Sequence, residues 1–461
     1  MKQEAVIKLT SPVDTGLFNM IFSGKMELSR FNIISEIKDS DHCFIINSLY
    51  GSADIIDKDT CNALLTGKAS GEELSAKGYL VDPEKEKAAF RTAYLRFIDE
   101  RDNDEIQLFF VPGYSCNFNC SYCYQGKYER MAGGLTREIT DAFFRHTDIE
   151  FAGRRRYITI FGGEPLLNGG HHRENIRYII ECAAERNIQI AIVTNGYHIS
   201  EYMDLMKKST IREIQVTLDG PREVHDKRRT LKNGEGTFDR IAEGVELLLK
   251  NDIPVNLRMV ADRDNIDSLP ALAQFAIDRK WTSCGHFSTQ IGRNYELHDC
   301  QVETTGRLFS RIEMYSELYR LIKKYPHILE FHRPAFAVSR ALYESGELPP
   351  PLFDACPGTK TEWAFDYRGN IYACTATVGK KGEELGVFFP EREMYKDKIE
   401  EWEERDILSI KECSECNLGL ICGGGCASVA RNRTGCNGSP DCRPVKELLE
   451  LGIAAYFPED S

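Results

Sequence analysis

Three cysteines stand close together in residues 113–126, which read GYSCNFNCSYCYQG. Cys116, Cys120 and Cys123 lie within eight residues of one another. A structural zinc ion needs four ligands in a closed tetrahedron, and a redox C-x-x-C pair needs only two thiols. Three thiolates suit a metal centre that keeps one coordination position open for another molecule.

A second set of cysteines follows after residue 350. Its spacing is C-x12-G-x4-C, then C-x2-C-x5-C-x3-C, then one more cysteine. The alternative is a zinc ribbon, which the C-x2-C pair alone would fit. The cysteines of this second set are Cys356, Cys374, Cys413, Cys416, Cys422, Cys426 and Cys442.

Three short polar motifs follow apolar runs in the middle of the chain. They are GGEP at residues 162–165, TNG at 194–196 and TLDGPREVHDKRR at 217–229. Adjacent glycines allow a backbone to approach a ligand closely, and Glu164 offers a carboxylate beside them. The alternative for each motif is an ordinary tight turn that ends a strand.

The elements that must position these motifs alternate in type along the chain. Apolar runs at 107–111, 157–161, 188–193, 213–218, 255–260 and, less clearly, 285–291 predict strands, with amphipathic helices between them. Such alternation predicts parallel strands joined by right-handed crossovers. Six units are too few for a closed eight-stranded barrel. We therefore expect a partial barrel or an open α/β sheet with its site in the loops at the carboxyl ends of the strands.

Composition changes mark the domain boundaries. Short strands, turns and a helix carrying Phe90, Tyr94 and Phe97 on one face precede the charged residues 101–105, and a long helix with Tyr315 and Tyr319 on one stripe ends before Pro326. After residues 349–352, PPPL, cysteines and glycines become frequent. The predicted domains are residues 1–105, 106–300, 301–350 (a helical bridge) and 351–461.

Charge and hydropathy limit the partners and the compartment. The formal net charge of the 461 residues is −13, which disfavours a nucleic-acid partner. No segment approaches the roughly 20 apolar residues that a membrane-spanning helix needs. We expect a cytoplasmic protein without a membrane partner. Its 16 cysteines then indicate metal binding or catalysis rather than disulfides.

The triplet, with Tyr122 before its last cysteine, resembles the signature of radical S-adenosylmethionine (SAM) enzymes. The resemblance implies that the three thiolates hold three irons of a [4Fe–4S] cluster, and that SAM chelates the fourth iron through its amino and carboxylate groups. GGEP resembles the motif that binds the SAM ammonium group, with Glu164 as its carboxylate. The cofactor-binding residues implied by the resemblance are Gly162, Gly163, Glu164, Pro165, Thr194, Asn195, Thr217 and Asp219. The implied fold is a partial (β/α)6 barrel.

The seven C-terminal cysteines resemble the SPASM domain, which holds two auxiliary [4Fe–4S] clusters in radical SAM enzymes that modify peptides. The resemblance implies one cluster on Cys413, Cys416, Cys422 and Cys442 and another on Cys356, Cys374 and Cys426. Two clusters need eight ligands, and the motif supplies seven. The remaining iron is either capped by Cys284, Cys300 or Cys436, or left open for a substrate thiolate. Cys43, Cys61 and Cys182 are expected to be plain buried thiols.

The N-terminal region is similar in architecture to the winged-helix-like leader-recognition domain of enzymes that modify ribosomally synthesised peptides; a structural cap is the alternative. The resemblance implies three [4Fe–4S] clusters, SAM, a precursor peptide with a leader, and an electron donor such as flavodoxin or ferredoxin. The favoured activity is formation of a thioether between a cysteine sulfur and a carbon of that peptide. Formylglycine formation in a sulfatase and a non-catalytic iron–sulfur electron carrier remain alternatives. No residue is indicated as a catalytic base.

Overall fold

The chain is described by a computed structural model over residues 26–38, 40–128, 134–294 and 306–458. Its centre is a ten-stranded sheet in the order β11-β10-β9-β8-β7-β6-β12-β13-β14-β15. Six neighbouring strands pair in parallel and in chain order. They are β6 (Ile106–Val111), β7 (Arg156–Ile160), β8 (Gln189–Thr194), β9 (Ile211–Thr217), β10 (Val255–Ala261) and β11 (Phe287–Arg293). The six strands predicted from apolar runs are confirmed.

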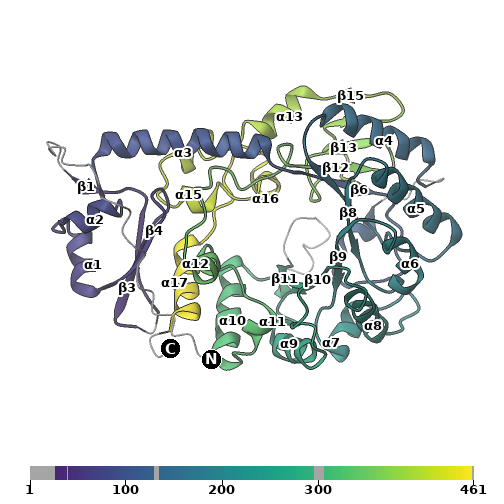
Figure 1. The fold of residues 1–461 in the computed structure, drawn as a ribbon, viewed down its shortest axis with the longest axis horizontal. Coiled ribbons are helices and arrows are strands. Elements are labelled where there is room, and N and C mark those ends of the chain that lie inside the picture. The colour runs from purple at the N-terminus through teal and green to yellow at the C-terminus, as the bar shows by residue number, and fades with distance from the viewer. Residues whose placement is uncertain (1–25, 39, 129–133, 295–305, 459–461) are drawn as a thin grey trace.

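Helices cover the outer side of the parallel strands (Figure 1). Strand β10 shows how the two faces differ, because its buried apolar residues alternate with the partly buried Asn256, Arg258 and Val260. The buried face belongs to the apolar core under the helices. Phe110, Ile158, Ile192 and Val216 are fully buried in this core. The covering helices are α4 (Arg137–Glu150), α5 (Gly170–Ala184), α6 (Ile199–Met206), α7 (Arg222–Arg228), α8 (Phe238–Leu249) and α9 (Leu269–Asp278).

A C-terminal hairpin extends the sheet beyond β6. Strand β12 (Glu362–Asp366) lies parallel to β6, and β13 (Asn370–Tyr372) returns antiparallel to β12. Two short strands, β14 (Gly386–Val387) and β15 (Glu393–Met394), complete the edge. The residues after 350 are therefore joined to the parallel sheet through main-chain hydrogen bonds, which the sequence patterns did not predict.

The N-terminal part is a three-stranded antiparallel sheet, β2 (Asn32–Glu36), β3 (His42–Asn47) and β4 (Ser52–Asp57), followed by helices α1 (Lys58–Leu65) and α2 (Glu72–Ala76). Gly78 follows α2 with φ of +73°, as predicted for a residue just past a helix end. The short strands β1 (Glu27–Leu28) and β5 (Leu80–Val81) pair antiparallel. Helix α3 (Pro83–Asn103) then leads to β6.

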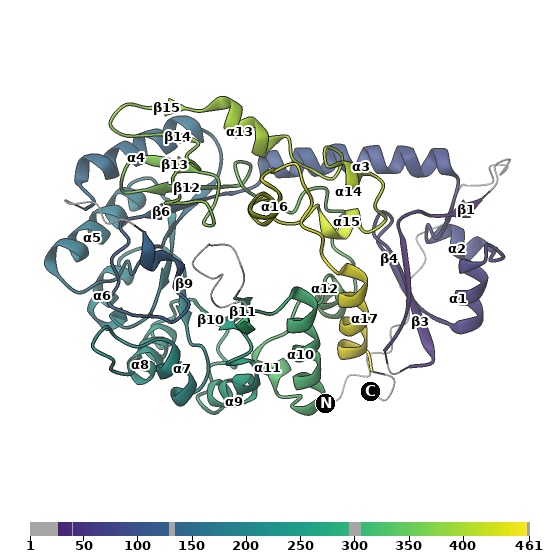
Figure 2. The ribbon, with the colours of Figure 1, turned by 180° about the vertical axis from the view of Figure 1, so that it is seen from behind.

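The N-terminal sheet packs on the last helix of the chain, α17 (Val445–Tyr456). Ile33 and Phe44 share an apolar cluster with Val445 and Leu449, and Figure 2 shows α17 between this sheet and α10 (Arg311–Lys324). Further segments of this region are α11 (Ile328–Phe331), α12 (Ser339–Ser345), α13 (Lys396–Glu403), α14 (Lys411–Ser414), α15 (Gly419–Cys422) and α16 (Ala427–Thr434).

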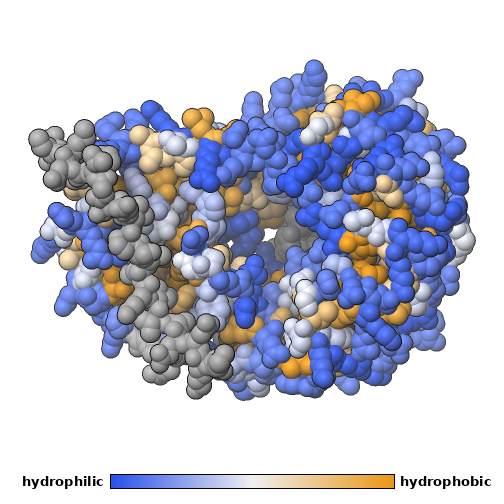
Figure 3. Space-filling view, in the orientation of Figure 1, coloured by the Kyte–Doolittle hydropathy of each residue, from blue (hydrophilic) through white to orange (hydrophobic). Residues whose placement is uncertain are grey.

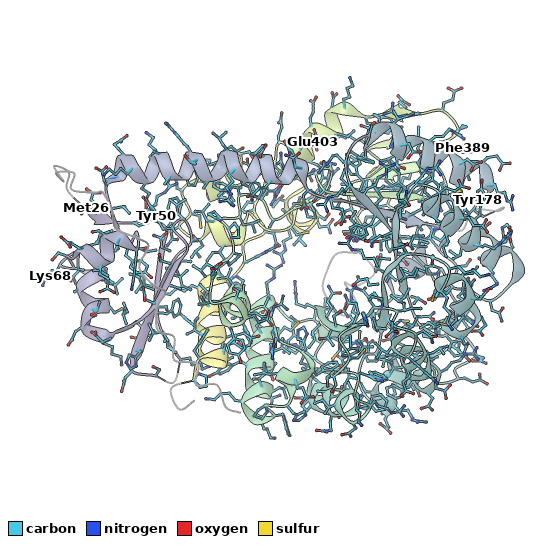
Figure 4. The ribbon with its side chains drawn as sticks, viewed as in Figure 1. Met26, Tyr50, Lys68, Tyr178, Phe389 and Glu403 are labelled. Carbon is cyan, nitrogen blue, oxygen red and sulfur yellow. The ribbon has the colours of Figure 1, made fainter. Side chains whose placement is uncertain are left out.

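Helix α3 links the two ends of the molecule. Phe90, Tyr94 and Phe97 all pack on the ring of Phe353, with centroid distances of 5.2, 5.2 and 5.6 Å, so the predicted apolar face is confirmed. Near the C-terminal end of α3, Glu403 of α13 lies beside the helix (Figure 4). Burial raises the pKa of Glu403, while the nearby cations Lys360 and Arg101 oppose that rise.

The space-filling view shows a hollow at the centre of the molecule, with mostly hydrophilic residues around it (Figure 3). Strands β8 and β9 lie on one side of this hollow, and α15 to α17 lie on the other (Figures 1 and 2). Within the described residues, no helix is both long and apolar enough to cross a bilayer.

Candidate iron–sulfur and cofactor site

The cysteine triplet lies in the loop after β6, where the sequence predicted a site. Main-chain bonds fix this loop against residues 228–232: the Asn119 N–H donates to the Thr230 carbonyl at 2.9 Å, and the Ser121 N–H donates to the Arg228 carbonyl at 3.0 Å. Cys116 and Cys120 are partly buried and Cys123 is exposed. After Cys123 the chain continues in the short 3-10 helix η1 (Tyr124–Lys127).

The two glycines of GGEP bring the loop after β7 against the triplet loop. Gly162 and Gly163 have φ of +95° and +52°. A Cβ on Gly163 would lie 2.4 Å from the Ser115 carbonyl oxygen, so this close approach needs glycine. The Glu164 N–H donates to the same oxygen at 2.8 Å. The Gly163 N–H donates to Gln125 Oε1 at 2.8 Å.

Glu164 joins GGEP to the TNG motif after β8. Its Oε1 accepts from the Thr194 hydroxyl at 2.6 Å and from the Leu166 N–H at 2.8 Å, and its Oε2 accepts from the Asn195 N–H at 2.6 Å. Burial raises the pKa of Glu164, and these donors oppose the rise. A carboxylate offers about four acceptor positions, so one remains for a ligand ammonium group.

Asn195 connects the TNG motif to the loop of the cysteine triplet. Its side-chain amide donates to Asn117 Oδ1 at 2.8 Å and lies 3.9 Å from the Cys116 sulfur. Residues 112–115, Glu164, Pro165 and the imidazoles of His171 and His172 line a cleft at this place. The predicted residues from Cys116 to Asn195 therefore lie together at the carboxyl ends of β6, β7 and β8.

Asp219 takes part in a buried network rather than facing the cleft. Its Oδ2 accepts from the Tyr122 hydroxyl at 2.6 Å and from Arg228 Nε at 3.3 Å, and its Oδ1 accepts from the Val260 N–H at 3.0 Å. Arg229 donates to the Tyr122 hydroxyl at 2.6 Å. Asp219 thus holds Tyr122 beside the triplet. Its direct contact with a ligand, like that of the buried Thr217 at the end of β9, stays a prediction.

His225 supports this network as a neutral imidazole. Its Nδ1 accepts the Asp219 N–H at 3.2 Å, so the proton resides on Nε2, which lies 3.0 Å from the Thr237 hydroxyl oxygen. Burial and the nearby cationic Arg229 lower the pKa of His225 to about 3. The sequence motif had singled out this histidine without indicating its structural role.

The donors of the triplet fit a cationic metal centre. Burial raises the pKa of Cys116 to about 12, and the negative charges of Glu164, Cys120 and Cys123 add to that effect, which the Phe118 N–H opposes. Burial also raises the pKa of Cys120, and Arg229 opposes it. A bound metal reverses such a rise because it takes the thiolate form.

The seven C-terminal thiols form two neighbourhoods. After burial, the charges of Cys422, Cys416 and Cys442 raise the pKa of Cys413 to about 11. In the other neighbourhood, burial and then the charge of Asp354 raise the pKa of Cys356, and the charge of Cys426 adds to that rise. Burial and then the charge of Glu362 raise the pKa of Cys374, and the charge of Cys356 adds to it. Among the described residues, no three His, Cys, Asp or Glu side chains surround one point as ligands of a single ion do. A cluster binds each thiolate at a different iron, which spaces its ligands farther apart.

Left-handed glycines and a buried arginine shape the backbone between these thiols. Gly423, Gly424 and Gly425 have φ of +59°, +72° and +73°. A Cβ on Gly425 would lie 2.0 Å from the Asp441 carbonyl oxygen, next to Cys442. The guanidinium of Arg405 donates to the carbonyls of Gly424 at 2.7 Å and Asn437 at 2.8 Å. No pattern in the sequence points to Arg405.

Glu362 was also missed. Its Oε1 accepts from the Thr375 N–H at 3.3 Å, directly after Cys374. Burial raises the pKa of Glu362 to about 7, and this hydrogen bond opposes the rise. The residue stands five positions after Pro357 in a segment without a recognised motif, so only the folded hairpin reveals that it lies beside Cys374.

The remaining cysteines have different surroundings. Cys284 lies in the turn before β11, and Cys436 is exposed after α16. Cys300 lies outside the described residues. Cys43, Cys61 and Cys182 are buried, as predicted.

Comparison with known families gives one domain match. Residues 110–276 match the model of the Radical SAM superfamily. Over 169 residues, the chain is 25% identical to a cysteine-type anaerobic sulfatase-maturating enzyme of Clostridium novyi, covering 35% of this chain and 45% of that protein. The chain spans less than two thirds of the length of the first curated relatives that it matches.

Solved structures share the fold over a larger part of the chain than the domain match covers. Native anSMEcpe with bound AdoMet and the Cp18Cys peptide aligns with a TM-score of 0.59 at 18% identity, covering 77% of this chain and 98% of that one. Streptococcus suis SuiB bound to its precursor peptide SuiA aligns with a TM-score of 0.54 at 14% identity, covering 91% of this chain and 99% of that one. At these identities the likeness concerns the fold.

Proposed function

Because the chain carries a radical SAM domain at residues 110–276, we propose that it modifies a ribosomally synthesised peptide by radical chemistry. The observation that carries the proposal is the meeting of the triplet, GGEP and TNG around Glu164. When bound, the cluster supplies the electron that cleaves SAM to methionine and a 5′-deoxyadenosyl radical, which takes a hydrogen atom from the peptide. Cys116, Cys120 and Cys123 hold that cluster, and Glu164 receives the ammonium group.

The C-terminal thiols support a reaction that forms a thioether. Formation of a carbon–sulfur bond removes one hydrogen atom from carbon and the proton from the thiol, and one surplus electron must leave the peptide. Two auxiliary [4Fe–4S] clusters on the seven cysteines provide an acceptor for that electron. The grouping of these thiols into two neighbourhoods supports the ligand sets that the SPASM resemblance implies.

We further propose that the N-terminal sheet binds the leader of the precursor. Strand β4 is an edge of that sheet, so it can accept an added strand. Ile55 of β4 is 46% exposed although it lies opposite the buried Phe44. An apolar cleft lined by Val338, Leu348, residues 349–350 and Ile421 lies where the N-terminal and C-terminal parts meet. SuiB, which aligns over 91% of this chain, is described with a precursor peptide.

Formylglycine formation is the second candidate. The likeness to anSMEcpe, whose structure contains the Cp18Cys peptide, and to a cysteine-type anaerobic sulfatase-maturating enzyme favours it. Both candidates begin with SAM cleavage, and the product separates them. A thioether keeps the cysteine sulfur in the peptide, whereas formylglycine replaces the thiol by an aldehyde.

The test is anaerobic turnover of the reconstituted enzyme with SAM, a reductant and two peptides, one leader-bearing and rich in cysteine and one from a sulfatase. We expect 5′-deoxyadenosine, and a loss of two hydrogen atoms with retained sulfur in the first peptide. The control is the Cys116→Ala, Cys120→Ala, Cys123→Ala variant, which should form no 5′-deoxyadenosine. Absence of SAM cleavage by the unchanged enzyme would favour an electron carrier.

A further inference from the structure

Glu362 and Cys374 are partners across the C-terminal hairpin. In the β12–β13 ladder, Ala364 pairs with Tyr372 and Phe365 pairs with Ile371. The same register continued by two residues brings Glu362 opposite Cys374. Directly opposed residues of an antiparallel pair point to the same face, with Cβ atoms about 4.5–5.5 Å apart. The hydrogen bond from the Thr375 N–H to Glu362 Oε1, at 3.3 Å, holds the carboxylate at this place.

The backbone of Glu362 is also fixed to the turn that follows Cys356. The Glu362 N–H donates to the Pro357 carbonyl at 2.9 Å, and the Thr359 N–H donates to the Glu362 carbonyl at 2.9 Å. Gly358 and Glu362 form an isolated parallel bridge. Cys374 therefore lies across the ladder from Glu362. Cys356 lies just before the turn to which the Glu362 backbone is hydrogen-bonded.

The third thiol of this neighbourhood approaches from α16. The Ser428 hydroxyl lies 3.3 Å from the Cys374 sulfur, and Ser428 is two residues after Cys426. Cys356, Cys374 and Cys426 are thus linked to Glu362 through the hairpin and the start of α16. Sequence reasoning left this trio one ligand short.

The carboxylate of Glu362 has no cation to balance it within the described part of the chain. The Thr375 N–H is its one hydrogen-bond donor there, and no ion pair of those residues includes it; Lys360, two residues before it, pairs with Asp354 instead. A partly buried carboxylate with spare acceptor positions is costly unless it is paired or binds a metal. Iron–sulfur clusters accept non-thiolate ligands at single irons.

We propose that the Glu362 carboxylate is the eighth protein ligand of the auxiliary clusters and completes the set of Cys356, Cys374 and Cys426. The proposal rests on the proposed function because it takes from it the two auxiliary clusters. An oxygen donor is harder than a thiolate and binds iron in a cluster less tightly. The iron that Glu362 would hold is therefore the one that would be most open to a substrate thiolate.

The test compares substitutions at Glu362 in the variant that lacks the triplet cysteines, so that only auxiliary clusters contribute. This background should hold about eight irons per chain. Glu362→Gln removes the charged ligand and should raise several-fold the fraction of clusters that lose one iron on mild oxidation, measured as the [3Fe–4S] signal in electron paramagnetic resonance. Glu362→Cys supplies a thiolate and should lower that fraction below the unsubstituted level.

The matched control is Glu393→Gln, an exposed glutamate on β15 of the same sheet, which should leave the signal unchanged. About eight irons with equal [3Fe–4S] fractions in all variants would overturn the ligand role and leave the auxiliary clusters standing. About four irons or fewer in the background variant would overturn the auxiliary clusters themselves. If the Glu362→Gln variant fails to take up iron, the Glu362→Cys variant provides the test. A spectrum of its reduced clusters that is unchanged from the background variant would contradict the proposal.

Discussion

The imidazole of His146 is held neutral where α4 packs on the C-terminal hairpin. Its ring lies 5.5 Å from the ring of Phe365, and its Nδ1 accepts from Arg392 Nε at 3.2 Å. Burial, and then the charge of Arg392, lower the pKa of His146 from 6.5 to about 4. The unfolded chain therefore takes up this proton first as the pH falls. The stabilisation is complete above about pH 6.5 and is lost between about pH 6.5 and about pH 4.

We predict that His146→Phe makes the fold less sensitive to acid. Between about pH 7 and about pH 5, the unchanged protein should lose about 2 kcal/mol more unfolding free energy than the variant. Urea unfolding of the cluster-loaded protein at both pH values measures the difference. His286→Gln, which removes an exposed histidine, is the control and should behave like the unchanged protein. If His146→Phe loses as much unfolding free energy as the unchanged protein, the imidazole of His146 is not held neutral.

At the scale of residues, the sequence predicted side chains within short motifs and missed those that act across the fold. Glu164 and Asn195 stand in motifs, and the structure brings them together. Tyr122 was noticed for its position in the triplet, yet its bonds to Asp219 and Arg229 span about a hundred residues of chain and follow from no local pattern. Glu362 likewise lies beside Cys374 through the folded hairpin, which no local pattern specifies.

The loop after β7 is the element whose shape depends most closely on glycine. We predict that Gly163→Ala lowers SAM binding and cleavage at least tenfold, because a Cβ would collide with the Ser115 backbone and φ is +52°. Equilibrium binding of SAM and the 5′-deoxyadenosine yield measure the effect. The matched control is Gly170→Ala, seven residues on, where a Cβ meets no atom within 4 Å and helix α5 begins.

The control should keep both quantities within about twofold of the unchanged enzyme, since alanine suits a helix start better than glycine. Full SAM cleavage by Gly163→Ala would show that the loop can move away from Ser115 without cost. The glycine would then have no part in forming the site.

At the scale of elements, apolar runs predicted strands and amphipathic periods predicted helices, because both signals are local. The pairing of β12 with β6 is not local: residues 107–111 bond to residues 362–366 across more than half of the chain. No pattern in either segment specifies that partner. The extension of the sheet by the C-terminal hairpin was therefore unpredictable from the sequence.

At the scale of the whole molecule, we predict that the exposed edge of the N-terminal sheet decides whether a leader binds. Ile55→Asp should weaken binding of a leader-bearing peptide by about 10- to 100-fold, because burial of an isoleucine side chain contributes about 1.5–3 kcal/mol. Fluorescence anisotropy of the labelled peptide measures it. SAM cleavage without peptide should not change, because β4 belongs to a sheet separate from the parallel strands.

Leu65→Asp is the matched control, because Leu65 is 61% exposed at the end of α1 and lies off the β4 edge. It should bind the peptide as the unchanged enzyme does. If Ile55→Asp also binds normally, the N-terminal sheet is a structural cap.

The packing of the N-terminal sheet on α17 also has a consequence for synthesis on the ribosome. Phe44 and Leu449 belong to one apolar cluster, although about 400 residues separate them. At roughly 5–20 residues per second, the nascent sheet waits roughly 20–80 seconds for the helix that covers it. Its apolar face and open β4 edge are exposed to other nascent chains during that time. Slow translation or low chaperone capacity should therefore lower the yield of folded protein more than the stability of the complete fold suggests.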